Sequence, residues 1–194
     1  MMQASFKPQA TALLVYHFTE FHTRPGSAGY EQPMVDALPA CAHLLDRCRA
    51  AGVLIAYVIS ETPRDASIGD DISSAIAPQA DDVVIRQSGS DGASGGAFAT
   101  PAFADLLRER GRDTLLITGI AVDRGLNDTA RRARGYGCRP IMVRGACFAQ
   151  DINESPVGPA SKEDIERVHL AALYRQGIGI MTVDEVLAVL AARA

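Results

Sequence analysis

Three residues that could take part in chemistry lie at or after the ends of apolar runs typical of β-strands. His17 lies at the end of one such run, Gln87 follows another, and Gly125 closes a turn after a third. A histidine with a pKa near neutral acts as a general acid or base. A helix that starts after Gly125 would place unpaired backbone N–H groups and the positive end of its dipole at the turn. These residues predict acid–base or anion-stabilising chemistry if the fold brings them together.

Further residues beside these three are candidate pocket residues, namely Glu20, Arg86, Ser88, Ala121, Val122 and Arg124. Glu20 is a candidate partner for His17. Arg86 would supply a cation if its strand ran one residue out of register, although such a shift turns a side chain to the opposite face. Ser88 is either a substitute nucleophile or simply loop. It opens the Ser/Gly-rich segment 88–96, whose composition fits an inert insertion or a mobile flap equally well.

The elements that must position these residues alternate along the chain. Short apolar runs predict six strands, at 12–18, 53–59, 82–86, 115–119, 140–143 and 178–181. Helical spacing and capping patterns predict helices at 34–51, 101–111, 126–134, 161–176 and from 182 onward. Residues 20–33 are predicted as loop, and 62–80 as loop with one short helix.

Alternating strands and helices predict the α/β class: one three-layer α/β/α domain over residues 1–194, with a six-stranded, mainly parallel, doubly wound sheet. Right-handed crossovers place the carboxyl ends of parallel strands at one edge, where ligands bind in such sheets. All the candidate site residues named above fall at that edge.

Composition excludes several classes of function. The net charge of -4 argues against nucleic-acid binding, and no apolar run approaches the roughly 20 residues of a membrane span. The start of the chain does not look like a secretory signal, so a cytoplasmic location is expected. Four cysteines, Cys41, Cys48, Cys138 and Cys147, show no metal-ligand spacing. No metal or other cofactor is expected, and Cys147 after the fifth strand is expected to be structural.

Three stretches carry a resemblance to a known family: ALLVYHFTEF, GAFATPAFADLLRERGRDTLLITGIAVDRG and LNDTARRARGYGCRPIMVRGA. In their order and spacing they resemble the isochorismatase-like family of cysteine hydrolases, over nearly the whole chain. The resemblance implies a homo-oligomer, a dimer or a tetramer. It also implies a triad of Asp, Lys and Cys, in which a thiolate attacks an amide carbonyl. The positions that match this triad hold His17, Gln87 and Gly125, so all three are substituted. The His-rich zinc motif of nicotinamidase-type members is absent.

These substitutions leave three functions open. The first is a hydrolase with a degenerate site, acting on a small polar or carboxylated molecule with His17 as acid or base. True isochorismatases also carry Gly at the Cys position, but they keep the Asp. The second is a catalytically inactive member that binds a small molecule or a protein partner. The third is a Cys-dependent amidohydrolase, which requires a different register at the turn. Filling of the pocket by Tyr16 or Phe18 would argue against any small-molecule ligand.

Overall fold

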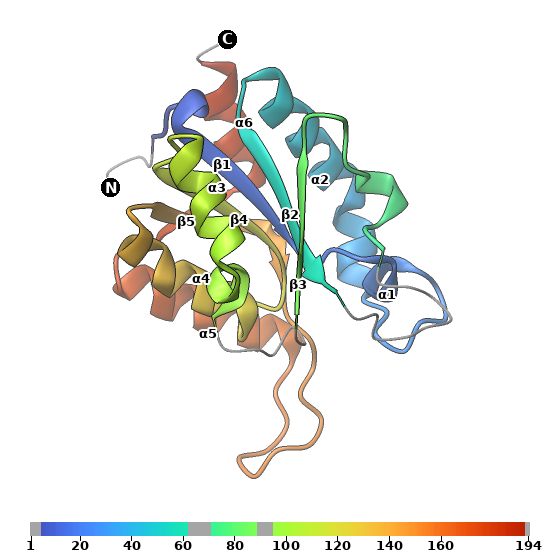
Figure 1. Cartoon of the computed structure of the whole chain (residues 1–194). Coiled ribbons are helices and arrows are strands. Elements are labelled where there is room, and N and C mark those ends of the chain that lie inside the picture. Colours follow the sequence, from blue (N-terminus) through green and yellow to red (C-terminus); the bar gives the residue numbers. More distant parts are fainter. Residues whose placement is uncertain (1–4, 62–70, 89–94, 193–194) are drawn as a thin grey trace.

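The computed structural model describes residues 5–61, 71–88 and 95–192, in which six strands form one parallel sheet of order β3-β2-β1-β4-β5-β6 (Figure 1). The strands are β1 (Thr11–Tyr16), β2 (Leu54–Ser60), β3 (Val83–Gln87), β4 (Thr114–Ile120), β5 (Arg139–Phe148) and β6 (Gly179–Thr182). Every residue of β1, β2 and β4 is buried, as expected for central strands covered on both faces. The α/β prediction is confirmed.

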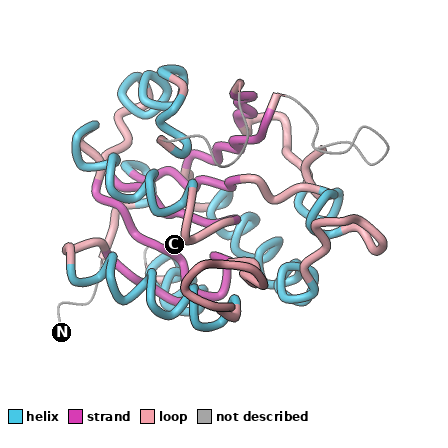
Figure 2. The backbone as a smooth tube through the Cα atoms, turned by 90° about the horizontal axis from the view of Figure 1, so that it is seen from below, coloured by secondary structure: helices cyan, strands magenta, loops and turns pink. Residues whose placement is uncertain are grey.

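Helices cover both faces of this sheet (Figure 2). One face packs against α2 (Gln32–Ala50) and α6 (Val183–Ala191), and the other against α3 (Pro101–Glu109), α4 (Gly125–Ala133) and α5 (Lys162–Arg175). The two buried clusters alternate along β1: Ala12, Leu14 and Tyr16 belong to the α3–α5 side, and Leu13 and Val15 to the α2–α6 side. This period of two decides which strand residues meet at the sheet edge.

Local sequence explains where several helices begin. The Ser161 hydroxyl accepts a hydrogen bond from the Asp164 backbone N–H at 3.2 Å and caps α5. Thr182 and Glu185 form a reciprocal capping box at the start of α6. Pro101 opens α3 at a position where a missing N–H costs nothing. These three helix starts agree with the sequence patterns.

Three predicted elements are corrected. The first strand, predicted over 12–18, ends at Tyr16. The fifth strand does not end at Val143 but continues to Phe148, after a register shift opposite the Ile117–Gly119 segment of β4. Such irregularities bend a strand and allow it to continue. Within 20–33, predicted as loop, residues Glu20–Thr23 form the short helix α1. The single turn Ser74–Ile76 is the short helix expected in 62–80. The structure does not describe residues 62–70 of that range, or residues 89–94 of the Ser/Gly-rich segment.

Candidate functional site

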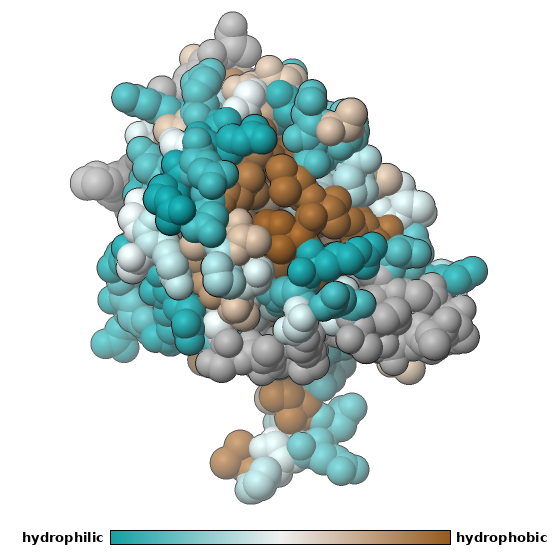
Figure 3. All heavy atoms as spheres, viewed as in Figure 1, coloured by the Kyte–Doolittle hydropathy of each residue, from teal (hydrophilic) through white to brown (hydrophobic). Residues whose placement is uncertain are grey.

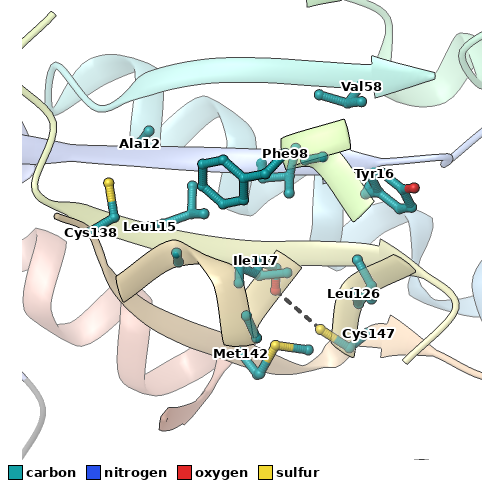
Figure 4. Packing of buried hydrophobic residues seen from close by; sticks show 14 of the residues in the cluster. Ala12, Tyr16, Val58, Phe98, Leu115, Ile117, Leu126, Cys138, Met142 and Cys147 are labelled. Atoms are coloured by element: carbon teal, nitrogen blue, oxygen red, sulfur yellow. Dashed lines mark hydrogen bonds between the residues drawn. The ribbon is translucent and has the colours of Figure 1, made fainter. Parts of the chain in front are cut away.

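Tyr16, Gln87 and Gly125 meet at the carboxyl edge of the sheet. The Tyr16 hydroxyl accepts a hydrogen bond from Gln87 Nε2 at 3.2 Å, and both side chains are buried. A Cβ atom placed on Gly125 would lie 2.4 Å from Tyr16 Cε1 and 2.6 Å from its hydroxyl oxygen. Figure 4 shows the Tyr16 ring at the same end of the core cluster as Leu126, the residue after Gly125. The phenol therefore fills the space that any side chain at position 125 would need.

His17 does not share this position, because strand β1 ends at Tyr16. The His17 backbone has a φ of 50°, an uncommon value for a residue other than glycine, and its N–H donates to the Val58 carbonyl at 3.0 Å. Its ring is fully buried and stands edge-on to the Tyr16 ring, with centroids 4.4 Å apart. His17 is thus beside Tyr16, whereas Tyr16 is the residue in contact with Gln87 and Gly125.

On β3 the residue that faces Tyr16 is Gln87 and not Arg86. Arg86 is exposed on the opposite side and lies 3.9 Å from the Asp71 carboxylate. Gln87 is only 3 % exposed, and its Oε1 atom accepts no hydrogen bond from any described residue. The strand register therefore places a neutral amide, not a cation, beside Tyr16.

Two of the predicted pocket residues are held by contacts outside this cluster. The Ser88 hydroxyl is exposed and donates to the Glu61 carboxylate at 2.7 Å. The Glu20 carboxylate accepts a hydrogen bond from the Ser74 backbone N–H at 2.7 Å, which ties α1 to the segment around residue 74. The pairing of Glu20 with His17 stays a prediction.

The turn before α4 is anchored on both sides. Ala121 and Val122 are buried, and the Val122 N–H donates to the Phe148 carbonyl at 2.9 Å. Arg124 donates to the Gln150 side-chain oxygen at 2.7 Å, so it is directed along the surface toward the end of β5. These contacts tie the turn before α4 to the end of β5 and to the residues just after it.

Residues 95–98 press against the first turn of α4. The Thr129 hydroxyl donates to the Gly125 carbonyl at 2.6 Å and accepts from the Ala97 N–H at 2.9 Å. A Cβ atom on Gly96 would lie 2.2 Å from the Gly125 carbonyl oxygen, and Gly96 has a positive φ of 55°. Only glycine fits there, so this packing fixes the position of Gly125 against Tyr16.

None of the four cysteines stands at the turn, and all four are buried. Cys147 lies inside β5, not after it, and its Sγ donates to the Ile117 carbonyl at 3.1 Å (Figure 4). Burial raises the pKa of the Cys147 thiol, and raises the pKa of Cys41 and of Cys48 to about 12. Because a thiolate is the nucleophilic form, these thiols are inert at neutral pH.

Within the described residues, no group of three or more His, Cys, Asp or Glu side chains is arranged to hold a metal ion. No helix in that same part of the chain is long and apolar enough to cross a membrane.

Tyr16 was considered from the sequence only as a side chain that could fill the pocket, and its contacts with Gln87 and Gly125 were not predicted. Strict alternation along β1 indicates that residues 12, 14 and 16 share a face, and a residue at the end of that face would reach the turn before α4. The apolar run continues through His17 and Phe18, however, so the end of the strand cannot be recognised from composition. The positive φ at His17 is what separates the two residues.

The comparisons with known proteins agree on one family. Residues 11–169 match the model of the isochorismatase domain. A maleamate amidohydrolase of Pseudomonas putida is 28 % identical over 153 residues, which cover 69 % of this chain and 70 % of that protein. A cysteine hydrolase from Pseudomonas syringae pv. phaseolicola has the same fold, with a TM-score of 0.88 and 21 % identity over the whole of both chains. A pyrazinamidase of Pyrococcus horikoshii, solved with zinc, has a TM-score of 0.72 and 20 % identity over 89 % of this chain and 99 % of that one. The family-model match extends over most of the sequence and includes the edge built by Tyr16, Gln87 and Gly125, so this chain belongs to the isochorismatase family of hydrolases.

Proposed function

We propose that this chain is an isochorismatase-family protein with a degenerate site. It binds a small molecule or a protein partner and does not catalyse thiol-dependent hydrolysis. One observation carries this proposal: the Tyr16 ring occupies the space beside Gly125, and its hydroxyl is bonded to the Gln87 amide. Two of the three triad positions, Gln87 and Gly125, thus pack against a neutral phenol, with no reactive side chain between them. The raised pKa values of the buried cysteines also argue against a substitute nucleophile, and thus against a Cys-dependent amidohydrolase.

The first test is enzymatic. Maleamate, the substrate named for the Pseudomonas putida relative, and a panel of small amides are incubated with the protein before and after treatment with iodoacetamide. The expected result is no ammonia release above the uncatalysed rate in either sample. Turnover that iodoacetamide abolishes would contradict the proposal.

A second test rebuilds the family triad in two registers. The variant Tyr16→Asp/Gln87→Lys/Gly125→Cys removes the ring and introduces the three groups at the positions that are in contact here. The matched variant His17→Asp/Gln87→Lys/Gly125→Cys keeps the ring against the introduced Cβ atom. We expect the first variant to present a thiol that reacts rapidly at pH 7, and the second to present a thiol that reacts slowly because the Tyr16 ring crowds it. Equal thiol reactivity and equal stability in the two variants would refute the assignment of Tyr16 to the site.

A second candidate function is acid–base hydrolysis of a small polar or carboxylated molecule by His17. It is supported by the burial of this histidine at the carboxyl edge, against the Tyr16 ring. On this hypothesis His17→Ala abolishes any turnover found with a substrate panel, while His43→Ala on the exposed face of α2 leaves it unchanged. Unchanged turnover in His17→Ala excludes the hypothesis.

A further inference from the structure

A cleft of about 460 Å³ lies at the amino edge of the sheet, where the strands begin. The residues that line it lead into β1, β4 and β5 and include Phe6, Lys7, Ala10, Asp113, Gly137 and Arg139. Cys138, which lies between two of these residues in the sequence, and Tyr16 stand at opposite ends of the core cluster in Figure 4. The cleft is therefore separate from the candidate functional site, and its volume suits a small molecule.

Two cations line this cleft, the Lys7 ammonium and the Arg139 guanidinium, and both side chains are exposed. Neither forms an ion pair with a carboxylate of any residue that the structure describes. The lining contains one carboxylate, that of Asp113, which accepts a hydrogen bond from the Thr114 hydroxyl at 2.9 Å. The cleft thus has an excess of positive charge in a chain whose net charge is -4.

The usual reason for cations at this edge does not apply to Lys7 and Arg139. Arginines in the last turns of helices, such as Arg47 in α2 and Arg132 in α4, interact with the negative end of the helix dipole. Lys7 instead precedes the short helix Pro8–Ala10, and Arg139 is the first residue of β5. Helix ends therefore do not account for these two charges, which are available to a ligand.

The Arg139 side chain is held at the cleft by the neighbouring backbone. Its Nη2 atom donates to the Ser5 carbonyl at 2.5 Å. A guanidinium carries five N–H donors, so this bond leaves donors for a two-point contact with a carboxylate or a phosphate. Burial, and then the charge of Arg110, lower the pKa of the Arg112 guanidinium, which adjoins Asp113 in the sequence. An anion at this edge would therefore relieve an excess of positive charge.

Part of the lining is apolar. Phe6 is only 3 % exposed and Ala10 is half-buried, and both contribute to the wall of the cleft. The largest group of hydrophobic residues in the view of Figure 3 lies over the edge strand β3, whereas the cleft lies at β1, β4 and β5. The mixed lining of the cleft fits a ligand that has both a charged group and a small apolar body.

We propose that this cleft binds a small organic anion, whose carboxylate or phosphate group is held by Lys7 and Arg139. The planar Arg139 guanidinium would contact two oxygen atoms, and the Lys7 ammonium would add a point charge. The Asp113 carboxylate would repel the ligand, so it limits the affinity. This site goes beyond the proposed function, because it lies at the other edge of the sheet and involves no residue of the Tyr16–Gln87–Gly125 cluster.

Calorimetric titration of the full chain tests the ligand class. The probes are benzoate, phenyl phosphate and, as a neutral molecule of similar size, benzyl alcohol. We expect at least one of the two anions to bind, with one molecule per chain, and benzyl alcohol not to bind at the same concentration. Tighter binding of phenyl phosphate would identify a phosphate ester as the preferred class, and tighter binding of benzoate a carboxylate. No binding of either anion up to about 10 mM, or equal binding of benzyl alcohol, would overturn the proposal.

Charge substitutions test the residues. Lys7→Gln and Arg139→Gln should each weaken anion binding about ten- to a hundredfold, because each removes a hydrogen bond to a charged group. Asp113→Asn keeps an acceptor for Thr114 but removes the repelling charge, so it should tighten binding. The matched control is Arg24→Gln, which removes a cation at the end of α1 and should change the affinity less than about twofold. Lys7 is exposed, so its variant tests the site even if Arg139→Gln disturbs the fold. Unchanged affinity in Lys7→Gln, or weaker binding in Asp113→Asn, would contradict the assignment.

The position of the ligand can be read from two backbone amides. Gly137 lines the cleft, and Gly125 lies in the candidate functional site. Titration with phenyl phosphate or benzoate should shift the NMR signal of the Gly137 amide and leave that of Gly125 unchanged. A shift at Gly125 alone would place the anion at the functional site and refute the second site, while leaving the proposed function intact.

Discussion

Replacing Gly125 with alanine tests the packing of the site most directly. The new Cβ atom would lie 2.4 Å from Tyr16 Cε1, well inside van der Waals contact. Tyr16 is completely buried, so its ring can move only by displacing the core. Overpacking of this kind costs about 1–3 kcal/mol, and loss of the hydrogen bond between Tyr16 and Gln87 about 0.5–1.5 kcal/mol more.

The helix preference for alanine over glycine offsets about 1 kcal/mol of this cost, because Gly125 is the first residue of α4. The expected net destabilisation is therefore about 0.5–3.5 kcal/mol, measured as the change in free energy of unfolding by urea titration. Gly135→Ala is the matched control: a Cβ atom there meets nothing within 4 Å. This control should be neutral or slightly stabilising.

A double-mutant cycle separates the clash from every other effect of the substitution. In a Tyr16→Ala background the ring is gone, and Gly125→Ala should cost nothing or stabilise the protein. The coupling between the two changes should be about 1–3 kcal/mol. If Gly125→Ala costs the same in both backgrounds, the Tyr16 ring does not fill the space beside Gly125 and the reasoning fails.

Three further outcomes are expected. Burial raises the pKa of Cys41 and Cys48 to about 12 in the folded chain, above the ordinary thiol pKa of about 9. The stability that the two protonated thiols contribute is therefore fully present below pH 9. The free energy of unfolding, measured by urea titration, should fall as the pH rises from about 9 to 12. The same thiols should react with iodoacetamide at pH 8 only after unfolding, and rapid labelling of the native protein would contradict their burial. Thr182→Ala should lower the free energy of unfolding by about 1 kcal/mol, because the Thr182 side chain caps α6. The control is Thr100→Ala, which should have a smaller effect because the Thr100 side chain makes no capping hydrogen bond at the start of α3. Equal losses in the two variants would show that the Thr182 cap is unimportant.

The fold follows from the sequence because its strands and helices have unambiguous patterns. The central strands are uninterrupted apolar runs, and helix starts such as Ser161 and Thr182 have side chains that satisfy free backbone N–H groups. The extension of β5 to Phe148 was not predicted, because it depends on a register shift that only pairing with β4 defines. The short helix α1 escaped notice because four residues provide no periodicity.

The site was predicted less completely, for a geometric reason. Gly125 and Gln87 fall where the sequence placed them, at the edge where the strands end. The residue from the first strand that meets them is Tyr16, one position before His17, and this difference rests on a single backbone φ angle. A strand pattern specifies alternation but not the residue at which it stops, so the sequence alone does not decide which of two neighbouring side chains contacts Gln87 and Gly125.

The close packing of Gly125 against Tyr16 also restricts which substitutions this protein can accept during evolution. Introducing a cysteine at position 125 while Tyr16 is present forces a side chain into occupied space. Shrinking Tyr16 first leaves a cavity, at a cost of about 3–5 kcal/mol for a large aromatic side chain. Either first step removes a large share of the roughly 5–15 kcal/mol that holds a typical domain folded. Each substitution is costly on its own, so a single mutation rarely introduces a thiol at this turn.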